Sequence, residues 1–263
     1  MGTDGSEHFF IMDFVRTDSL VLLTIIFVAV TLLVARWKGL ASVVSMALTF
    51  LLIMVFVLPK LADGVNPVLI ALVASALIIP VTFYLSHGVN KKTTAAILAS
   101  WITLLFTGFL AYIFINLGKL SGTASDEAAT LSTFLHGTVN MKGLLLAGFI
   151  IGTLGILDDI TISQAAIVEA LAKTTKHKLG HLYSKGMEVG RDHISSNVNT
   201  LILVYAGTSL PLMLIFIDNP HPFSEVVNYE FIAEAIIRTL VGSIGLVIAV
   251  PVTTLIAAWF YSS

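Results

Sequence analysis

Long, uninterrupted apolar runs constrain this chain more than any other feature of its sequence. A membrane-spanning helix needs about 20 mostly apolar residues to cross roughly 30 Å of hydrocarbon. Seven stretches meet that test, approximately residues 19–35, 40–58, 67–86, 94–117, 142–159 or beyond, 195–217 and 236–261. They are continuously apolar and rich in Leu, Ile and Ala, unlike the short alternating strands of a membrane barrel. The sequence therefore predicts an all-α polytopic membrane protein with about seven transmembrane helices.

Composition supports this interpretation and excludes several classes of function. Only 11% of the 263 residues are charged and 57% are hydrophobic, so too few polar side chains are available to cover a water-soluble globule. A net charge of −2 provides no basic field for nucleic acid. The chain has no cysteine, which excludes disulfides, thiol nucleophiles and cysteine-ligated metal centres. It also has no phosphate-binding loop of the Gly-x-x-x-x-Gly-Lys-Ser/Thr type, so any pumping must use an ion gradient or a separate subunit.

Basic residues are distributed unevenly among the predicted loops. Nine Lys and Arg residues fall on one side, and five fall on the other side together with eleven acids. Because Lys and Arg concentrate on the cytoplasmic side of membrane proteins, we expect the N-terminus outside and the C-terminus inside. The expected organisation is an extracytoplasmic N-terminal remnant, residues 1–18, and a transmembrane helical domain, residues 19–263. A cytoplasmic amphipathic and basic segment is expected at about residues 160–192.

The most informative stretch of the chain carries two adjacent aspartates after a series of glycines. On a helix, Gly148, Gly152, Gly155 and Asp159 share one side. Small residues on one side of a membrane helix let another helix approach closely. We therefore expect Asp159 in a helix–helix seam and Asp158 on the adjoining face, in the inner third of the bilayer or at its inner edge.

Two interpretations of this aspartate pair remain open. A carboxylate inside a membrane costs several kcal/mol unless it is paired, hydrated or protonated, and adjacent carboxylates repel each other. Such a group takes up and releases a proton or binds a cation. Alternatively, the pair caps the N-terminus of a following amphipathic helix, residues 160–172, that lies on the inner surface.

Polar side chains also enter the sixth predicted span. On a helix, Asp192, Ser195, Ser196 and Asn199 lie on one side, and polar groups inside hydrocarbon must be satisfied by neighbours or by water. We expect this polar stripe to face the aspartate pair from the opposite helix. The alternative is that it only holds two helices together by hydrogen bonds.

The last span begins with a potential ion pair. Glu234 and Arg238 stand at i,i+4, and Arg238 shares a face with Gly242 and Gly245. We expect these two glycines to pack against another helix. The ion pair is either an anchor at the outer interface or a functional group, with Arg238 reaching inward as the partner of a carboxylate or an anionic substrate.

No metal or cofactor site is expected. His177 and His181 have a spacing that suits two metal ligands on a helix, but they stand among several lysines. A solvated basic face attracted to anionic lipid is the better interpretation.

Three segments carry a family resemblance. They read GTLGILDDITISQA at 152–165, GRDHISSNVNTLILVYAGTSLPL at 190–212 and RTLVGSIGLVIAVPVTT at 238–254. In this order and spacing they resemble the YibE/F family of bacterial integral membrane proteins. The resemblance implies that Asp159 matches a recurring aspartate of the family. The other polar positions of the family are matched by Asp158, Arg191, Asp192, Asn199, Glu234 and Arg238.

The resemblance also implies a location and a domain arrangement. It places the chain as a multi-pass protein in the bacterial cytoplasmic membrane. Members often carry an earlier membrane helix and an extracytoplasmic β-rich domain. We expect this chain to be a short form without both, in which residues 7–16 resemble the join that follows that domain.

These observations favour a secondary transporter or permease over an enzyme. Asp158 and Asp159 are expected to bind a proton or cation, with Asp192 and Asn199 completing the site. Arg191, Glu234 and Arg238 are expected to be gating or structural polar groups. The expected partners are the bilayer, an ion or small-molecule substrate and a second copy of the chain.

Two alternatives to transport are open. The first is an assembly or scaffold subunit in which the glycine faces are interfaces and the carboxylates are only caps. The second is an intramembrane enzyme, which is disfavoured because an aspartyl protease needs two carboxylates that face each other from different helices.

Overall fold

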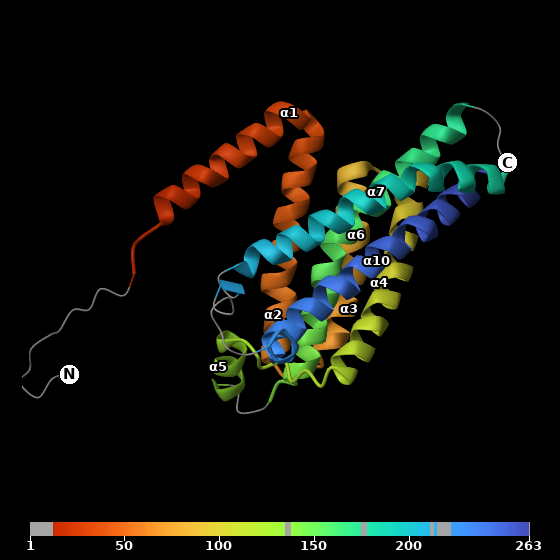
Figure 1. Ribbon diagram of the computed structural model, residues 1–263. Helices are drawn as coiled ribbons and strands as arrows, with labels where there is room; N and C mark the ends of the chain where they lie inside the picture. The colour runs from red at the N-terminus through yellow and green to blue at the C-terminus, as the bar shows by residue number, and fades with distance from the viewer. Residues whose placement is uncertain (1–12, 135–137, 175–177, 211–212, 215–221, 263) are drawn as a thin grey trace, which may run out of the picture.

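The computed structural model describes residues 13–134, 138–174, 178–210, 213–214 and 222–262. This part of the chain is helical and contains no strand, so the predicted all-α class is confirmed. The elements are α1 (Thr17–Leu52), the π-helical turn η1 (Ile53–Val57), α2 (Leu58–Ala62), α3 (Pro67–His87), α4 (Lys91–Leu117), α5 (Asp126–Phe134), α6 (Met141–Thr174), α7 (Leu179–Thr208), α9 (Phe223–Val226) and α10 (Glu230–Tyr261) (Figure 1).

Five helical segments in the described part of the chain are long and apolar enough to cross a membrane. They are Thr17–Ala62, Pro67–His87, Lys91–Leu117, Met141–Thr174 and Glu230–Tyr261. The predicted count of seven is not confirmed. The first two predicted spans belong to one helical segment, and the sixth corresponds to α7, which is not among the five.

A sharp bend at Arg36 divides α1 into two limbs. Its φ of 53° and ψ of −129° are far from helical values, and a positive φ is uncommon for a residue other than glycine. The limb before the bend projects away from the other helices (Figure 1), and its Leu33 and Val34 are each 80% exposed. The limb after the bend packs along α3, where Ser45 Oγ donates a hydrogen bond to the Thr82 carbonyl oxygen. Only the second limb therefore belongs to the packed bundle.

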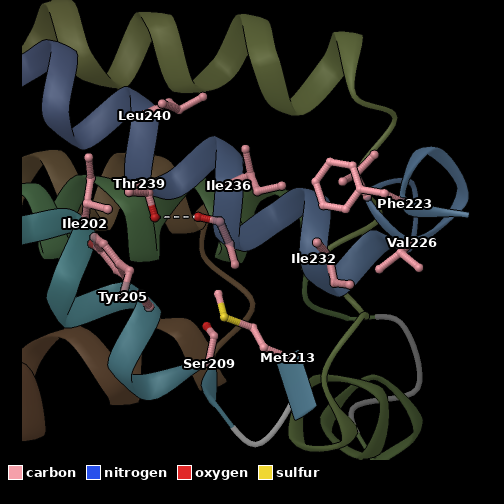
Figure 2. A pocket seen from close by; sticks show the side chains of 13 residues that line it. Ile202, Tyr205, Ser209, Met213, Phe223, Val226, Ile232, Ile236, Thr239 and Leu240 are labelled. Carbon is pink, nitrogen blue, oxygen red and sulfur yellow. Dashed lines mark hydrogen bonds between the residues drawn. The ribbon is translucent and has the colours of Figure 1, made fainter. Parts of the chain in front are cut away.

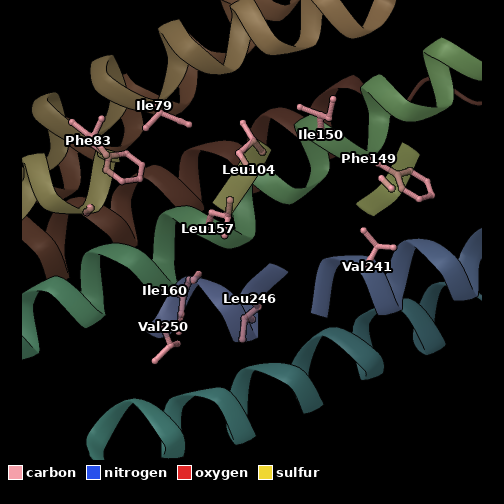
Figure 3. Close-up of a cluster of buried hydrophobic side chains, with 14 of the residues drawn as sticks. Ile79, Phe83, Leu104, Phe149, Ile150, Leu157, Ile160, Val241, Leu246 and Val250 are labelled. Carbon is pink, nitrogen blue, oxygen red and sulfur yellow. The ribbon is translucent and has the colours of Figure 1, made fainter. Parts of the chain in front are cut away.

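The core lies where α4, α6 and α10 meet, and α3 adds to it from one side (Figure 3). Leu104 of α4, Leu157 of α6 and Leu246 of α10 are almost completely buried. Hydroxyl groups lie among these apolar side chains, and Ser100 and Thr161 hydrogen-bond to each other at 2.9 Å, which joins α4 to α6. The centre of the bundle is therefore apolar packing with a few polar contacts between helices.

Three glycines allow close approach of neighbouring helices. A Cβ atom added at Gly245 of α10 would lie 2.4 Å from Thr107 Oγ1 of α4. Cβ atoms added at Gly186 and Gly190 of α7 would lie 2.8 Å and 2.6 Å from side-chain carbons of α10. Gly245 was one of the glycines expected to pack, whereas Gly242 is in looser surroundings, with the nearest atom 3.8 Å from its added Cβ. Gly186 and Gly190 were not predicted as packing residues, although they set how closely α7 approaches α10.

We expect Gly190→Ala to destabilise the protein although alanine is the better helix former. The added methyl group would collide with Val250 and Gln164, and overpacking of this kind costs about 1–3 kcal/mol. Gly207→Ala on the same helix is the matched control, because nothing lies within 4 Å of its added Cβ. It should be neutral or stabilise by about 0.5–1 kcal/mol. Thermal unfolding in detergent, followed by circular dichroism, measures both, and equal unfolding temperatures would contradict the close contact.

Candidate functional site

Asp158 and Asp159 lie in the middle of a continuous helix. α6 runs from Met141 to Thr174 without an interruption, so the backbone amides after the pair are bonded within the helix. An N-cap must stand at a helix start. The cap interpretation is therefore wrong, and the pair is part of an apolar helix that is long enough to cross a membrane.

Asp159 shares an open face of α6 with the three glycines. Gly148, Gly152, Gly155 and Asp159 are all exposed, and a Cβ atom added at any of these glycines would meet no atom within 4 Å. The other sides of α6 contact α3, α4 and α10. The expected seam between this stripe and another helix of the same chain is therefore not formed within the described residues.

Asp158 is half-buried and lies on the side of α6 that faces α3. Ile151 and Leu154 pack against a buried cluster that includes Ile70 and Ile78 of α3, and Asp158 follows these two residues at i+7 and i+4, which places it on the same face. Neither Asp158 nor Asp159 has a hydrogen-bond or ion-pair partner among the described residues. The two adjacent carboxylates thus point to different surroundings, one toward α3 and one toward the open face.

The carboxylates lie toward the basic end of the bundle. His87, at the end of α3, is within electrostatic reach of Asp159, Lys38 and Lys92. Lys92 of α4 in turn lies 4.0 Å from Glu169, which is further along α6. A cation or proton that reached the pair from this end would first pass these titratable groups.

The polar stripe of α7 points away from the rest of the bundle. Asp192 and Asn199 are exposed, as are Ser195 and Ser196, whereas the opposite side of the helix carries Gly186 and Gly190, which face α10. The prediction that this stripe faces the aspartate pair is therefore wrong within this chain.

Near its beginning, α7 also presents charged groups to solvent. Arg191 is exposed. Lys185 donates a hydrogen bond of 2.8 Å to Glu188, and this bond lowers the pKa of Glu188 and raises that of Lys185. The outward face of α7 is thus polar over several turns.

Glu234 and Arg238 form an ion pair that is turned toward the bundle. The Arg238 guanidinium donates to Glu234 and its central carbon lies 4.9 Å from the centre of the Phe149 ring of α6. Arg238 Nε is buried and has no hydrogen-bond partner among the described atoms. Phe149 precedes Asp159 by ten positions, or about 15 Å along the helix. The arginine therefore reaches inward, but to an aromatic ring and not to the aspartate pair.

Gln164 is a buried amide near the aspartate pair that the sequence did not predict as a site residue. Gln164 is 0% exposed, and its Nε2 donates to the Gly186 carbonyl oxygen of α7 at 2.9 Å and to Thr254 Oγ1 of α10 at 2.7 Å. Its Oε1 has no hydrogen-bond partner among the described atoms. Gln164 thus joins three helices and keeps one free acceptor.

Asp158, Thr161 and Gln164 form a row with a spacing of three residues. Such a row follows one side of a helix with a gradual turn, and here it leads from a half-buried carboxylate to two completely buried polar groups. The three-residue spacing of these polar residues is visible in the sequence. It predicts a shared face only if the helix continues past Asp159, which the sequence alone left open. Thr161 is hydrogen-bonded to Ser100, whereas Asp158 and Gln164 Oε1 have no partner among the described residues. Polar groups that lack a protein partner commonly hold water, so the two ends of this row are suited to hydration or proton movement. In the described part of the chain, no three His, Asp or Glu side chains are grouped closely enough to hold a metal ion.

The comparison with known families decides the relationship. The family model described as YibE/F-like protein matches residues 23–263. The chain belongs to the YibE/F-like family. The resemblance inferred from the three motifs is thereby confirmed, and the matched range contains every residue discussed for the site. No curated protein and no solved structure matches this YibE/F-like chain.

In this YibE/F-like protein, Gln164 and Thr254 should be energetically coupled. Gln164→Leu and Thr254→Val each remove one partner of a buried hydrogen bond, which costs about 1–3 kcal/mol. Because both remove the same bond, the double variant should lose about 0.5–1.5 kcal/mol less than the sum of the single variants. Unfolding of all four proteins in detergent measures this difference. Additive losses would contradict the assigned contact.

Proposed function

We propose that this YibE/F-like protein is an ion-coupled transporter or permease of the bacterial cytoplasmic membrane in which Asp158 and Asp159 bind a proton or cation. The observation that carries the proposal is the placement of two adjacent carboxylates in the middle of a long apolar helix, without a hydrogen-bonded or ion-paired partner among the described residues. Carboxylates so placed need a proton, a cation or water. Residues that meet this need reversibly are typical of ion pathways.

The basic end of the bundle is the proposed cytoplasmic side. The ends of α4, α6 and α10 meet there, since Lys92 of α4 lies 4.0 Å from Glu169 of α6 and Lys91 of α4 donates to the Phe260 carbonyl oxygen of α10. Lys38 follows the bend of α1 directly. We further propose that the 46-residue segment Thr17–Ala62, which comprises α1, η1 and α2, crosses twice. Its helical length is about 69 Å at ~1.5 Å per residue, and the bend at Arg36 divides it into two limbs. With α7 as a further crossing, the proposed total is seven, with the N-terminus outside.

In the proposed cycle an ion reaches Asp159 from the open face of α6 and is shared with Asp158. Neighbouring carboxylates repel each other, so neutralising one eases the charge on the other. Asp158 then passes the ion or proton toward the polar row that begins at Thr161. Asp192 and Asn199 are left out of this cycle because they face away. Arg238 and Glu234 remain the proposed gate, beside Phe149 and about 15 Å along α6 from Asp159.

Asp158 and Asp159 do not suit catalysis by an aspartyl protease. That chemistry needs two carboxylates that face each other, and these two point to different sides of one helix. The proposal is therefore transport and not an enzymatic reaction.

One observation favours the second candidate, a membrane assembly subunit. Gly148 and Gly152 have the Gly-x-x-x-Gly spacing that lets membrane helices pack closely, yet nothing in the described chain covers them. Under this alternative a second copy of the chain covers the stripe, and the carboxylates support assembly and not ion movement.

Purified protein in liposomes should distinguish the two candidates. A potassium diffusion potential drives the ion, a pH-sensitive dye inside the liposomes reports proton flux, and radioactive sodium reports sodium flux. We expect wild-type protein to conduct one of the two ions. Asp159→Asn should reduce that flux about tenfold or more. Asp126→Asn is the matched control, because Asp126 is exposed in the first turn of α5. It should keep the wild-type flux.

The same variants test the alternative. Wild-type ion flux in Asp159→Asn and in Asp158→Asn would overturn the transport proposal. The assembly candidate replaces the transport proposal if two results are obtained. The double variant Asp158→Ala with Asp159→Ala elutes from size-exclusion chromatography as a smaller assembly than wild-type protein, and neither protein raises the ion flux above that of protein-free liposomes.

A further inference from the structure

α7 and α10 separate at one end and leave an apolar cavity between them. They are in close contact at Gly186 and Gly190, but farther along, from Ile202 to Ser209 of α7, they border a half-open cavity of about 600 Å³ (Figure 2). Figure 2 shows Ile202 and Leu240 at one end of it and Phe223 and Val226, which belong to α9, at the other. The volume is in the range of about 300–1,000 Å³ that small-molecule sites have.

The described part of the wall favours an apolar occupant. Among the described residues that line the cavity none is charged, and the polar side chains are Tyr205, Ser209 and Thr239. The Thr239 hydroxyl is already used, since it donates to the Ala235 carbonyl oxygen at 2.7 Å. Two hydroxyl groups on an otherwise apolar wall suit a long apolar chain with one acceptor near its end.

The position of the cavity suits one leaflet of a bilayer. Along α10 it extends as far as Leu240, ten residues after the start of the helix, or about 15 Å. That is half of the roughly 30 Å hydrocarbon thickness. Leu203 and Val204, which follow the lining residue Ile202 in α7, and Ile244, four residues after Leu240 in α10, are exposed apolar side chains. The cavity therefore continues an exposed apolar surface of a helix that is suited to a membrane, where acyl chains are the surrounding solvent.

We propose that this cavity binds one acyl chain of a membrane phospholipid. The chain lies between α7 and α10 with its tail toward Ile202 and Leu240, and its ester end lies toward α9, where Ser209 donates a hydrogen bond to it. An empty apolar space of this size would leave its lining without dispersion contacts. The bound chain supplies these contacts and supports α7 where its direct contact with α10 ends. This site is separate from the aspartate pair and does not depend on the proposed transport.

Photolabelling in liposomes tests the site. The probe is phosphatidylcholine with a diazirine in one acyl chain, diluted into unlabelled phosphatidylcholine, and labelled peptides are identified by mass spectrometry. We expect labelling of peptides that contain residues 202–209 and 232–240 to exceed labelling of the exposed α3 surface around Leu77 about tenfold.

Filling the cavity should remove this difference. Ala206→Trp and, on the facing wall, Ala235→Phe place a large side chain in the cavity, whereas Ala76→Trp adds the same bulk on the exposed side of α3. Circular dichroism first confirms that each variant is folded. Both filling variants should lower labelling of the cavity peptides about tenfold, and the control should not.

Three results would overturn the proposal. One is equal labelling of α3 and the cavity peptides, which indicates only general contact with lipid. Another is labelling that neither filling variant reduces. The third is stronger labelling by a free fatty acid that carries the same diazirine, which would mean that the cavity selects the free acid and not the phospholipid.

Discussion

The cost of placing polar groups among apolar helices governs this structure. Most hydroxyl groups in the bundle avoid that cost locally by donating to the carbonyl four residues earlier on the same helix, as Thr107, Thr161 and Thr253 do. Gln164 and Ser100 instead bond across helices and so hold the core together. Within the described residues, Asp158 and Asp159 have neither a local hydrogen bond on their own helix nor a hydrogen bond to another helix. Because they lack these contacts, they need a proton, a cation or water to stabilise them.

Two kinds of glycine have different roles in the fold. Gly186, Gly190 and Gly245 stand at close contacts within the chain and fix how α7 and α4 approach α10. Gly148 and Gly152 stand on an open face of α6 and contact nothing there. The first group is therefore structural in the single chain, whereas the second group, together with Asp159, offers a face to lipid, water or another molecule.

The sequence predicted the helical class, the family and the unusual position of the aspartate pair. Periodicity shows which residues share a face of a helix, but it does not show which neighbour that face meets. For that reason the α6 glycines were expected in a helix–helix seam, although their face of α6 is open in the described structure. The polar stripe of α7 was expected to face the aspartate pair, although it points away from the bundle. The break between the first two predicted spans coincides with the bend at Arg36, but the two limbs are joined in one helix and not separated by a loop. Gln164 was missed because it stands in a segment that the cap interpretation assigned to the membrane surface.

We propose that Asp158 and Asp159 are exchangeable carboxyl groups inside the membrane. Dicyclohexylcarbodiimide tests this claim directly, because this apolar reagent takes a proton from a carboxylic acid and then bonds to the carboxyl oxygen. In liposomes, we expect mass spectrometry to find the adduct on Asp158 or Asp159, with less adduct as pH rises or, for a sodium site, as sodium is added. Absence of the adduct at both positions over the whole pH range in which the protein stays folded would contradict an exchangeable carboxyl group at this place in α6.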